Sequence, residues 1–168
     1  MPDRIESPDI DESPLQGELP RAYALRLAQA KAAAVQRRAG EIVLAGDTTV
    51  AVGRRILPPA ETEAVQRQLL GLISGRRHRC ISAVCVIDAD GTARTRVVET
   101  TVIFKRLTGQ EIDAYIASGE GLGKAGGYAI QGRAEALIRQ VAGSHSGVIG
   151  LPLFETRALL KAAGYPLG

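Results

Sequence analysis

Residues 40–49 read Gly-Glu-Ile-Val-Leu-Ala-Gly-Asp-Thr-Thr, and this stretch decides the fold class. Its apolar run at 42–45 is typical of a strand that is buried on both faces. A helical pattern precedes the run from Pro20 to about Ala39, because apolar residues recur on one face and Pro20 suits a first helical turn. Gly40 then ends the helix. A helix followed at once by a buried strand indicates α/β architecture.

The rest of the chain continues this alternation of helices and strands. A hairpin is favoured at Asp90-Gly91, and the pattern Thr108-Gly-Gln-Glu111 is a capping box that begins a helix. No repeat or long linker divides the chain, so we expect residues 1–168 to form a single α/β domain. The other predicted elements are a short strand and loop through Leu19, helices at 61–73, 108–118 and 151–163, and strands at 80–87 and 92–104.

Charge and composition narrow the partners and the compartment. The net charge is only +3 and the basic residues are scattered, so nothing indicates a nucleic-acid partner. No apolar run reaches the roughly 20 residues of a membrane span, and the N-terminus has no signal-peptide core. Cys80 and Cys85 are five positions apart in a predicted strand, so they face opposite sides and form neither a disulfide nor a shared metal site. Two free buried thiols predict a reducing, cytoplasmic location.

Two charged residues stand out by their positions in predicted elements. Asp47 follows the apolar run at 42–45, where it is either a metal ligand and proton acceptor or only a turn or helix-cap carboxylate. Lys31 lies four residues from both Leu27 and Val35 on the apolar face of the first helix. Its side chain either extends along that face to solvent or reaches into a site, where it would neutralise phosphate. Position alone leaves both pairs of alternatives open.

A glycine-rich stretch and an acidic cluster are further candidates. Residues 118–132 contain six glycines around Lys124, which fits either a phosphate-binding loop or a flexible surface loop. Gln131 offers a donor and an acceptor, as reading a base edge requires. The cluster Asp9-Ile-Asp-Glu12 is either a source of metal ligands or an exposed loop. His78 and His145 share no ligand spacing with each other or with the cysteines, so we predict no zinc site.

Taken together, these segments resemble the Maf family over essentially the whole chain. Each motif is short, but their order and spacing make the combination specific. The matching motifs are Asp9-Ile-Asp-Glu12, Leu27-Ala-Gln-Ala-Lys-Ala32, Val43-Leu-Ala-Gly-Asp-Thr48, Leu72-Ile-Ser-Gly-Arg-Arg-His78, Glu111-Ile-Asp-Ala-Tyr115, Lys124-Ala-Gly-Gly-Tyr-Ala-Ile-Gln-Gly132 and Gly150-Leu-Pro-Leu153.

The resemblance implies a nucleoside triphosphate pyrophosphatase. The implied fold is an α/β domain with a central mixed sheet, flanking helices and a deep nucleotide-binding cleft, and homodimers are common. The reaction converts a nucleoside triphosphate to the monophosphate and pyrophosphate with a divalent metal, Mg²⁺ or Mn²⁺. Gln131-Gly132 is similar to the branch that acts on dTTP and UTP, whereas Glu at that position is typical of the branch that prefers 7-methyl-GTP. By family position the catalytic residues are Asp47, Glu12 and Lys31, the substrate-binding residues are Thr48, Gln131 and Lys124, and the metal ligands are Asp47 and Glu12.

The sequence also departs from the family pattern. Family members begin with a Ser-x-Ser-Pro-Arg-Arg segment, and Met1 falls after the place for it, so we expect this chain to be less active and less stable than one extended upstream. A family lysine is absent where Pro58-Pro59 stands, and the late Ser-Tyr-Ser-Asn motif reads Ser144-His-Ser-Gly147. Two functions therefore compete, the working pyrophosphatase and a nucleotide-binding or regulatory protein of low activity linked to cell division.

Overall fold

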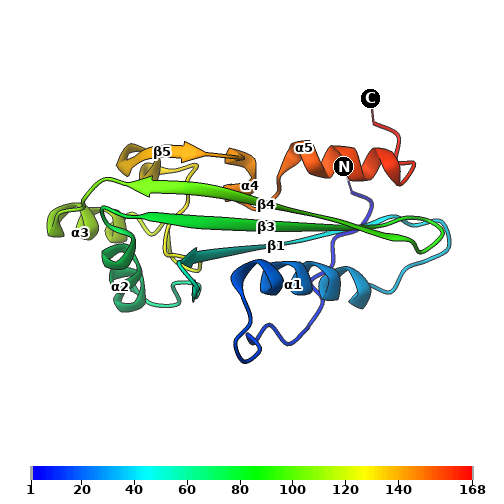
Figure 1. Ribbon diagram of the computed structural model, residues 1–168, viewed down its shortest axis with the longest axis horizontal. Coiled ribbons are helices and arrows are strands. Elements are labelled where there is room, and N and C mark those ends of the chain that lie inside the picture. Colours follow the sequence, from blue (N-terminus) through cyan, green and yellow to red (C-terminus); the bar gives the residue numbers. More distant parts are fainter. Residues whose placement is uncertain (1, 168) are drawn as a thin grey trace.

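The computed structural model describes residues 2–167, and a five-stranded sheet lies at its centre (Figure 1). Helices pack on both faces of the sheet, so the expected α/β class is confirmed. The expected mixed sheet is wrong within this range, because every strand pairing is antiparallel. Short turns after β1 and β3 reverse the chain at once and make the β1–β2 and β3–β4 pairs antiparallel. The strands in sheet order are β2 (Arg55–Leu57), β1 (Val43–Val52), β3 (Arg77–Ile87), β4 (Ala93–Phe104) and β5 (Ile138–Ala142).

The hairpin of β3 and β4 is the longest pairing and confirms the prediction at Asp90-Gly91. Oδ1 of Asp88 accepts hydrogen bonds from the backbone N–H groups of Asp90 and Thr92, at 3.1 and 2.8 Å. Gly91 has a φ of +90°, in the region that favours glycine. The two cysteines of β3 face opposite sides as predicted, because Cys80 packs with one core cluster and Cys85 with another.

Helix α1 (Pro20–Ala34) lies close against one face of the sheet. Its Ala24, Ala28 and Ala32 are fully buried against β1 and β3, and such small side chains allow the helix backbone to approach the strands. The helix begins at Pro20 as predicted but ends at Ala34, before the expected Ala39. Its last turn carries Lys31, so the fold places this side chain beside β1.

The opposite face carries the other helices and a larger core cluster. Leu69 and Ile73 of α2 pack there with Phe104, while Leu159 of α5 packs on Val84 farther along β3. The predicted capping box at Thr108 is confirmed. The sequence analysis missed β2, β5 and the two short helices η1 and α4. The helices on this side are α2 (Glu63–Ile73), α3 (Gly109–Ala117), the 3₁₀ helix η1 (Arg133–Leu137), α4 (His145–Ile149) and α5 (Leu153–Ala162).

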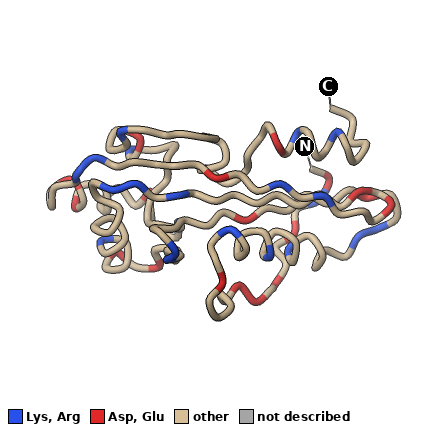
Figure 2. Tube along the Cα trace, in the orientation of Figure 1, with Lys and Arg blue, Asp and Glu red and all other residues tan. Residues whose placement is uncertain are grey.

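The segment before α1 contains no strand in residues 2–19, so the expected short strand is wrong. Pro8 and Pro14 lack the N–H group that strand pairing uses, and side-chain contacts hold the segment instead. The expectation about Met1 lies outside the described residues. Lys and Arg are spread along the whole trace among acidic residues (Figure 2). Between residues 2 and 167, no helix has the length and hydropathy that crossing a membrane requires.

Strand β1 has an open edge, and the candidate site forms there. β2 pairs only with residues 50–52 of β1, and no other strand in the described chain pairs with the outer edge of 43–49. Leu44 is 41% exposed, so the run at 42–45 is not buried on both faces as expected. Asp47 lies in the middle of β1 rather than at its end. Its side chain is 9% exposed and pairs with Lys31 of α1, so it lies on the face of the sheet that α1 covers.

Candidate active site

Three charged side chains from separate parts of the chain meet beside the open edge of β1. Nζ of Lys31 lies 2.9 Å from Oδ1 of Asp47 and 2.9 Å from Oε1 of Glu12. Thr49 donates a hydrogen bond from Oγ1 to Oδ2 of Asp47, at 3.1 Å. Of the two alternatives for Lys31, the structure shows the inward one. The three residues expected to be catalytic are therefore in direct contact.

The lysine at the centre of this group is charged at neutral pH. Burial alone lowers the pKa of Lys31, but hydrogen bonds to Asp47 and Glu12, together with their charges, outweigh it and raise the pKa above its usual value. One ammonium between two carboxylates offsets their mutual repulsion. The positive charge of Lys31 therefore holds Asp47 and Glu12 together.

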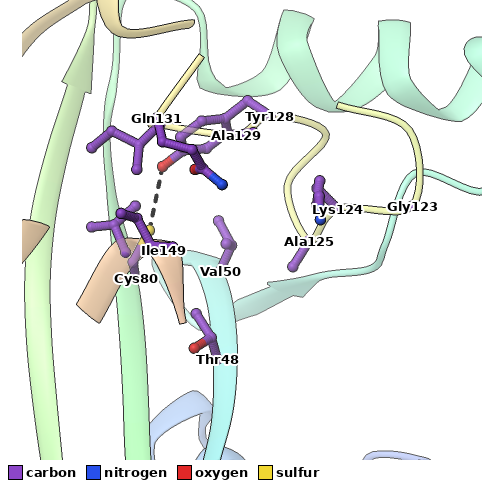
Figure 3. Close-up of a pocket in the computed structure, with 12 residues that line it drawn as sticks. Thr48, Val50, Cys80, Gly123, Lys124, Ala125, Tyr128, Ala129, Gln131 and Ile149 are labelled. Atoms are coloured by element: carbon purple, nitrogen blue, oxygen red, sulfur yellow. Dashed lines mark hydrogen bonds between the residues drawn. The ribbon is translucent and has the colours of Figure 1, made fainter. Parts of the chain in front are cut away.

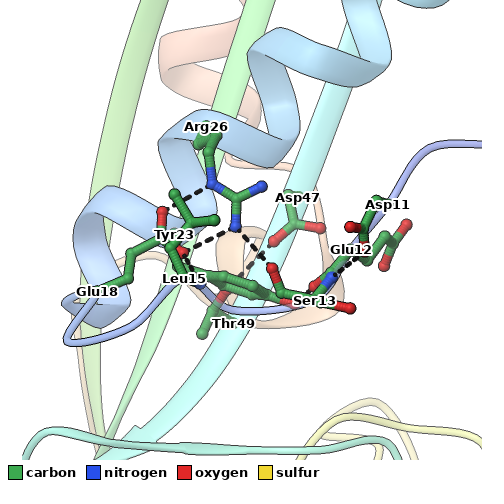
Figure 4. Close-up of polar contacts among 9 residues, drawn as sticks. All are labelled: Asp11, Glu12, Ser13, Leu15, Glu18, Tyr23, Arg26, Asp47 and Thr49. Atoms are coloured by element: carbon green, nitrogen blue, oxygen red, sulfur yellow. Dashed lines mark hydrogen bonds and ion pairs between the residues drawn. The ribbon is translucent and has the colours of Figure 1, made fainter.

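The segment that carries Glu12 is fastened to α1 by two side chains of that helix (Figure 4). Tyr23 donates from its hydroxyl to the carbonyl of Glu12 at 2.8 Å, and Arg26 donates to the carbonyl of Ser13 at 3.1 Å. Arg26 also forms two 2.7 Å hydrogen bonds to the carboxylate of Glu18 and lies over the ring of Tyr23. Sequence reasoning missed both anchors, although their spacing of three residues put them on one side of the helix.

The three residues expected to bind substrate line one cavity, here called the Gln131 cavity (Figure 3). Thr48 comes from β1, and Lys124 and Gln131 come from the glycine-rich segment. Thr48 is fixed by hydrogen bonds with the hydroxyl of Ser82 at 3.1 Å and the carbonyl of Gly150 at 3.3 Å. The cavity therefore brings strand and loop residues together.

A second cavity, here called the Asp47 cavity, adjoins the first. Asp47 and Glu12 line it together with Tyr23. Thr48 and Ala125 line both cavities, so the two cavities share part of their walls.

Close packing explains some of the glycines of the segment 118–132, whereas Gly119 and Gly123 have open space around them and a positive φ. A Cβ at Gly121 would lie 2.1 Å from the carbonyl oxygen of Gly127, and a Cβ at Gly126 would lie 2.9 Å from Val50. Gln66, which is fully buried on α2, donates to the carbonyl of Gly127 at 3.0 Å. The segment is therefore packed against α2 and β1 around Gly121, Gly126 and Gly127, while residues 122–124 between them are exposed.

A carboxylate holds the far end of this segment next to Gln131. Oε2 of Glu120 accepts a hydrogen bond from the backbone N–H of Arg133 at 2.6 Å. The same oxygen leaves no room for a side chain at Gly132, where a Cβ would lie 2.2 Å away. Gln131 is thus presented from a turn that is fixed on its C-terminal side.

Three buried side chains form a hydrogen-bonded group at the wall of the Gln131 cavity. The hydroxyl of Tyr128 lies 2.7 Å from Nε2 of His78 and 3.3 Å from Sγ of Cys80, and both Tyr128 and Cys80 line the cavity. Burial lowers the pKa of His78 to about 4 and raises that of Tyr128 well above its usual value, so both are neutral at pH 7. Sequence reasoning considered His78 only as a zinc ligand. The alternation of His78 and Cys80 on one face of a strand was the missed signal.

With this geometry in place, comparison with known proteins decides the family. Residues 1–163 match the Maf-like protein family. The chain belongs to this family. It is 65% identical over all 168 residues to the dTTP/UTP pyrophosphatase of Sphingopyxis alaskensis, covering 88% of that protein. It is 61% identical over 97% of its length to the dTTP/UTP pyrophosphatase of Novosphingobium aromaticivorans, and 56% over 98% to that of Caulobacter vibrioides, covering 82% and 86% of those proteins.

In this Maf-like chain, the late motif at 144–147 begins helix α4. Ser144 caps the helix by accepting from the N–H of Gly147 at 2.9 Å. Ser82 on β3 donates to the carbonyl of Gly147 at 2.5 Å and also pairs with Thr48. Through Ser82, the motif therefore links α4 to Thr48, the β1 residue that lines both cavities.

The carboxylates of this Maf-like site can be compared with a metal centre. No three His, Cys, Asp or Glu side chains within residues 2–167 gather as a metal-binding group. Asp47 and Glu12 nevertheless aim one oxygen each at a single point, the Nζ of Lys31. Carboxylate oxygens are the donors that Mg²⁺ and Mn²⁺ prefer, so these two residues fit a divalent cation that takes its remaining ligands from water and phosphate.

Proposed function

We propose that this Maf-like chain hydrolyses dTTP and UTP to the nucleoside monophosphate and pyrophosphate. The observation that carries the proposal is the convergence of Lys31, Asp47 and Glu12 next to a cavity lined by Gln131 and Lys124. Relatives that share half or more of its residues are named dTTP/UTP pyrophosphatase. In the proposed complex, the base lies in the Gln131 cavity and the phosphates extend past Lys124 into the Asp47 cavity.

The reaction joins a water oxygen to the α-phosphorus and breaks the bond from that phosphorus to the oxygen that bridges to the β-phosphate. Pyrophosphate leaves, and one proton is lost from the attacking water. Asp47 accepts that proton, since it is the carboxylate held rigidly between Lys31 and Thr49. Lys31 and Lys124 stabilise negative charge on the phosphate oxygens, which is most of what such a displacement needs from a protein.

A divalent cation is part of this proposal. Asp47 and Glu12 would hold it, because their oxygens already converge on one positive charge. When bound, Mg²⁺ or Mn²⁺ would offset phosphate charge. Before the cation and substrate bind, the positive charge of Lys31 keeps the two carboxylates together. The cation would then supply positive charge to the carboxylates, and the phosphates would supply negative charge to Lys31.

Location and self-association are proposed on separate grounds. Cys80 and Cys85 are free and buried, which supports a reducing compartment such as the cytoplasm. Phe154 is 83% exposed and Leu153 and Ile149 are also exposed, which supports a homodimer through this part of α4 and α5.

The test is the change Asp47→Asn, which keeps the size of the side chain and removes its charge. We expect the release of pyrophosphate from dTTP to fall by about a hundredfold or more, with the thermal melt within a few degrees of the parent. The matched control is Asp113→Asn on α3, an exposed carboxylate paired only with Arg67, which should leave the rate unchanged. Hydrolysis by Asp47→Asn at the parent rate would sink the proposal.

One observation favours the alternative of a nucleotide-binding protein with little catalysis. Pro59 lines the Asp47 cavity at the position where the family pattern has a lysine, so one positive charge is absent from that wall. Calorimetry with dTTP, run beside the pyrophosphate assay, separates the two functions. Tight binding without release of pyrophosphate would favour the alternative.

A further inference from the structure

The hydrogen bonds of Tyr128 leave one strong donor at the wall of the Gln131 cavity. His78 is 2% exposed, and its neutral ring carries a single N–H. Its Nδ1 is buried and has no partner, while Nε2 lies 2.7 Å from the hydroxyl of Tyr128. A buried N–H without an acceptor is rarer and costlier than an unfilled lone pair. The proton therefore lies on Nε2, and His78 donates to the oxygen of Tyr128.

The hydroxyl hydrogen of Tyr128 must then point to an acceptor other than His78. Its one remaining partner within the described chain is Sγ of Cys80, at 3.3 Å, and sulfur is a weak acceptor. Burial keeps the phenol protonated, so it cannot escape this arrangement by losing its proton. Cys80 and Tyr128 both line the cavity with Gln131, so a stronger acceptor bound there competes directly with the sulfur (Figure 3).

We propose that Tyr128 donates its hydroxyl hydrogen to a carbonyl oxygen of the pyrimidine base, and that His78 is the positioning residue that orients this donor. The inference rests on the proposed function and names a specificity determinant for it. Uracil and thymine carry carbonyl oxygens at positions 2 and 4. With Gln131, which supplies both a donor and an acceptor, Tyr128 gives the cavity a pattern that fits these bases.

The test pairs the change Tyr128→Phe with substrates that lack one good acceptor. Kinetic constants are measured for UTP, 2-thio-UTP and 4-thio-UTP, in which sulfur replaces one carbonyl oxygen. The parent should use one of the two thio substrates about tenfold less efficiently than UTP, because sulfur accepts the hydrogen bond poorly. Tyr128→Phe should raise the KM for UTP by roughly tenfold to a hundredfold, change kcat little, and treat that thio substrate and UTP alike.

Variants of His78 separate positioning from packing. His78→Gln keeps an N–H donor near the place of Nε2 and should keep the discrimination between UTP and the thio substrate. His78→Phe keeps an aromatic ring against Phe104, whose centroid is 5.8 Å away, but removes the donor and should lose the discrimination. A role in packing alone would lower the melting temperature of these variants and leave the discrimination intact.

The outcomes for this inference and for the proposed function are distinct. Equal discrimination by the parent and Tyr128→Phe, with pyrophosphate released by both, would overturn the role of Tyr128 and leave the hydrolysis standing. No release of pyrophosphate by the parent would overturn the hydrolysis, and dissociation constants from calorimetry with the same three nucleotides would then decide the role of Tyr128. Unchanged relative affinities in Tyr128→Phe would overturn the inference there too.

Discussion

The two adjoining cavities are built from opposite kinds of interaction. The Asp47 cavity is bordered by ion pairs on an open strand edge, and Glu12 reaches it from a segment without regular structure. Apart from the exposed Lys124, the Gln131 cavity is bordered by neutral groups, of which Tyr128 is 5% exposed, and its loop is packed against α2. The charged groups of the Asp47 cavity can exchange their ion-pair partners for a cation and phosphates. The fixed neutral groups of the Gln131 cavity can only select ligands by shape and by hydrogen-bond pattern.

This difference assigns separate tasks to the two cavities. We expect changes in the Asp47 cavity to alter the rate for every nucleotide by a similar factor, because phosphates are common to all of them. Changes in the Gln131 cavity should alter the ranking of bases and the stability of the core. Each prediction below tests that division, in order of expected effect.

The largest effect is expected from Lys31→Met, which breaks the charged side. The change leaves Asp47 and Glu12 facing each other without their shared ammonium and removes a phosphate-binding charge. We expect kcat/KM to fall by on the order of a hundredfold to a thousandfold for both dTTP and UTP, with their ratio unchanged. Because the lysine is partly exposed, the loss of stability should be only about 1–2 kcal/mol.

Lys105→Met is the matched control for that prediction, since Lys105 forms an ion pair with Glu111 away from both cavities. It should leave hydrolysis unchanged. A large change in the ratio of dTTP to UTP use by Lys31→Met would contradict the division of tasks.

The same comparison shows why the sequence predicted some parts well. Lys31 and Asp47 stood out as candidates because a charge on an apolar helix face and a carboxylate beside an apolar strand are both anomalous in a local pattern, but only the family resemblance assigned their roles. The capping box at Thr108 and the hairpin at Asp90-Gly91 were also local signals, and both are confirmed. Such features depend on neighbours within a few residues, which a single sequence displays.

The rest depends on contacts between distant residues. Asp47 was expected at a strand end, but it lies in the middle of β1, which continues past it to pair with β2, and no local pattern encodes that. The pairing of His78 with Tyr128 joins positions that are 50 residues apart. The strand β5 is mostly exposed at the sheet margin, so its burial pattern lacks the alternation that predicts strands.

The second prediction concerns the effect of acid on the buried neutral group that contains His78. The pKa of His78 is about 4 in the folded chain against an ordinary 6.5, so between these pH values the unfolded chain binds a proton that the folded chain does not. The free energy of unfolding should therefore fall as the pH decreases from about 6.5 to about 4, with a contribution from His78 of roughly 3 kcal/mol at most. Urea unfolding of the parent and of His78→Gln across this range measures it.

The comparison needs the variant because carboxylates elsewhere in the chain also affect stability in acid. Hydrogen bonds to Arg26, Arg94 and Lys105 lower the pKa of Glu18, Asp88 and Glu111 respectively, so these groups also lose stabilising interactions in acid. They are present in both proteins, and the difference between the two curves isolates His78. Parallel curves for the two proteins would show that His78 is not buried and neutral.

The third prediction sharpens the recognition side. Gln131→Glu replaces an amide donor with a negative charge, so the ratio of kcat/KM for dTTP over that for 7-methyl-GTP should fall by about tenfold or more. Gln140→Glu, an exposed change on β5 with the same chemistry, should leave the ratio unchanged. An equal ratio for the parent and Gln131→Glu would make Gln131 a structural residue of the turn.

The smallest effect is expected from Tyr23→Phe, which removes a hydrogen bond that holds Glu12 at the Asp47 cavity but removes no charge. The hydroxyl of Tyr23 holds the carbonyl of Glu12, so its loss gives that carboxylate more freedom at a cost of about 0.5–1 kcal/mol. The half-saturating concentration of Mg²⁺ should rise by about threefold, and kcat at saturating Mg²⁺ should stay close to the parent value. Because dTTP and UTP share their phosphates, the shift should be the same for both. Tyr165→Phe, at an exposed position after α5, is the control. If Tyr23 only stabilises the fold, the melting temperature will fall and the dependence on Mg²⁺ will not move.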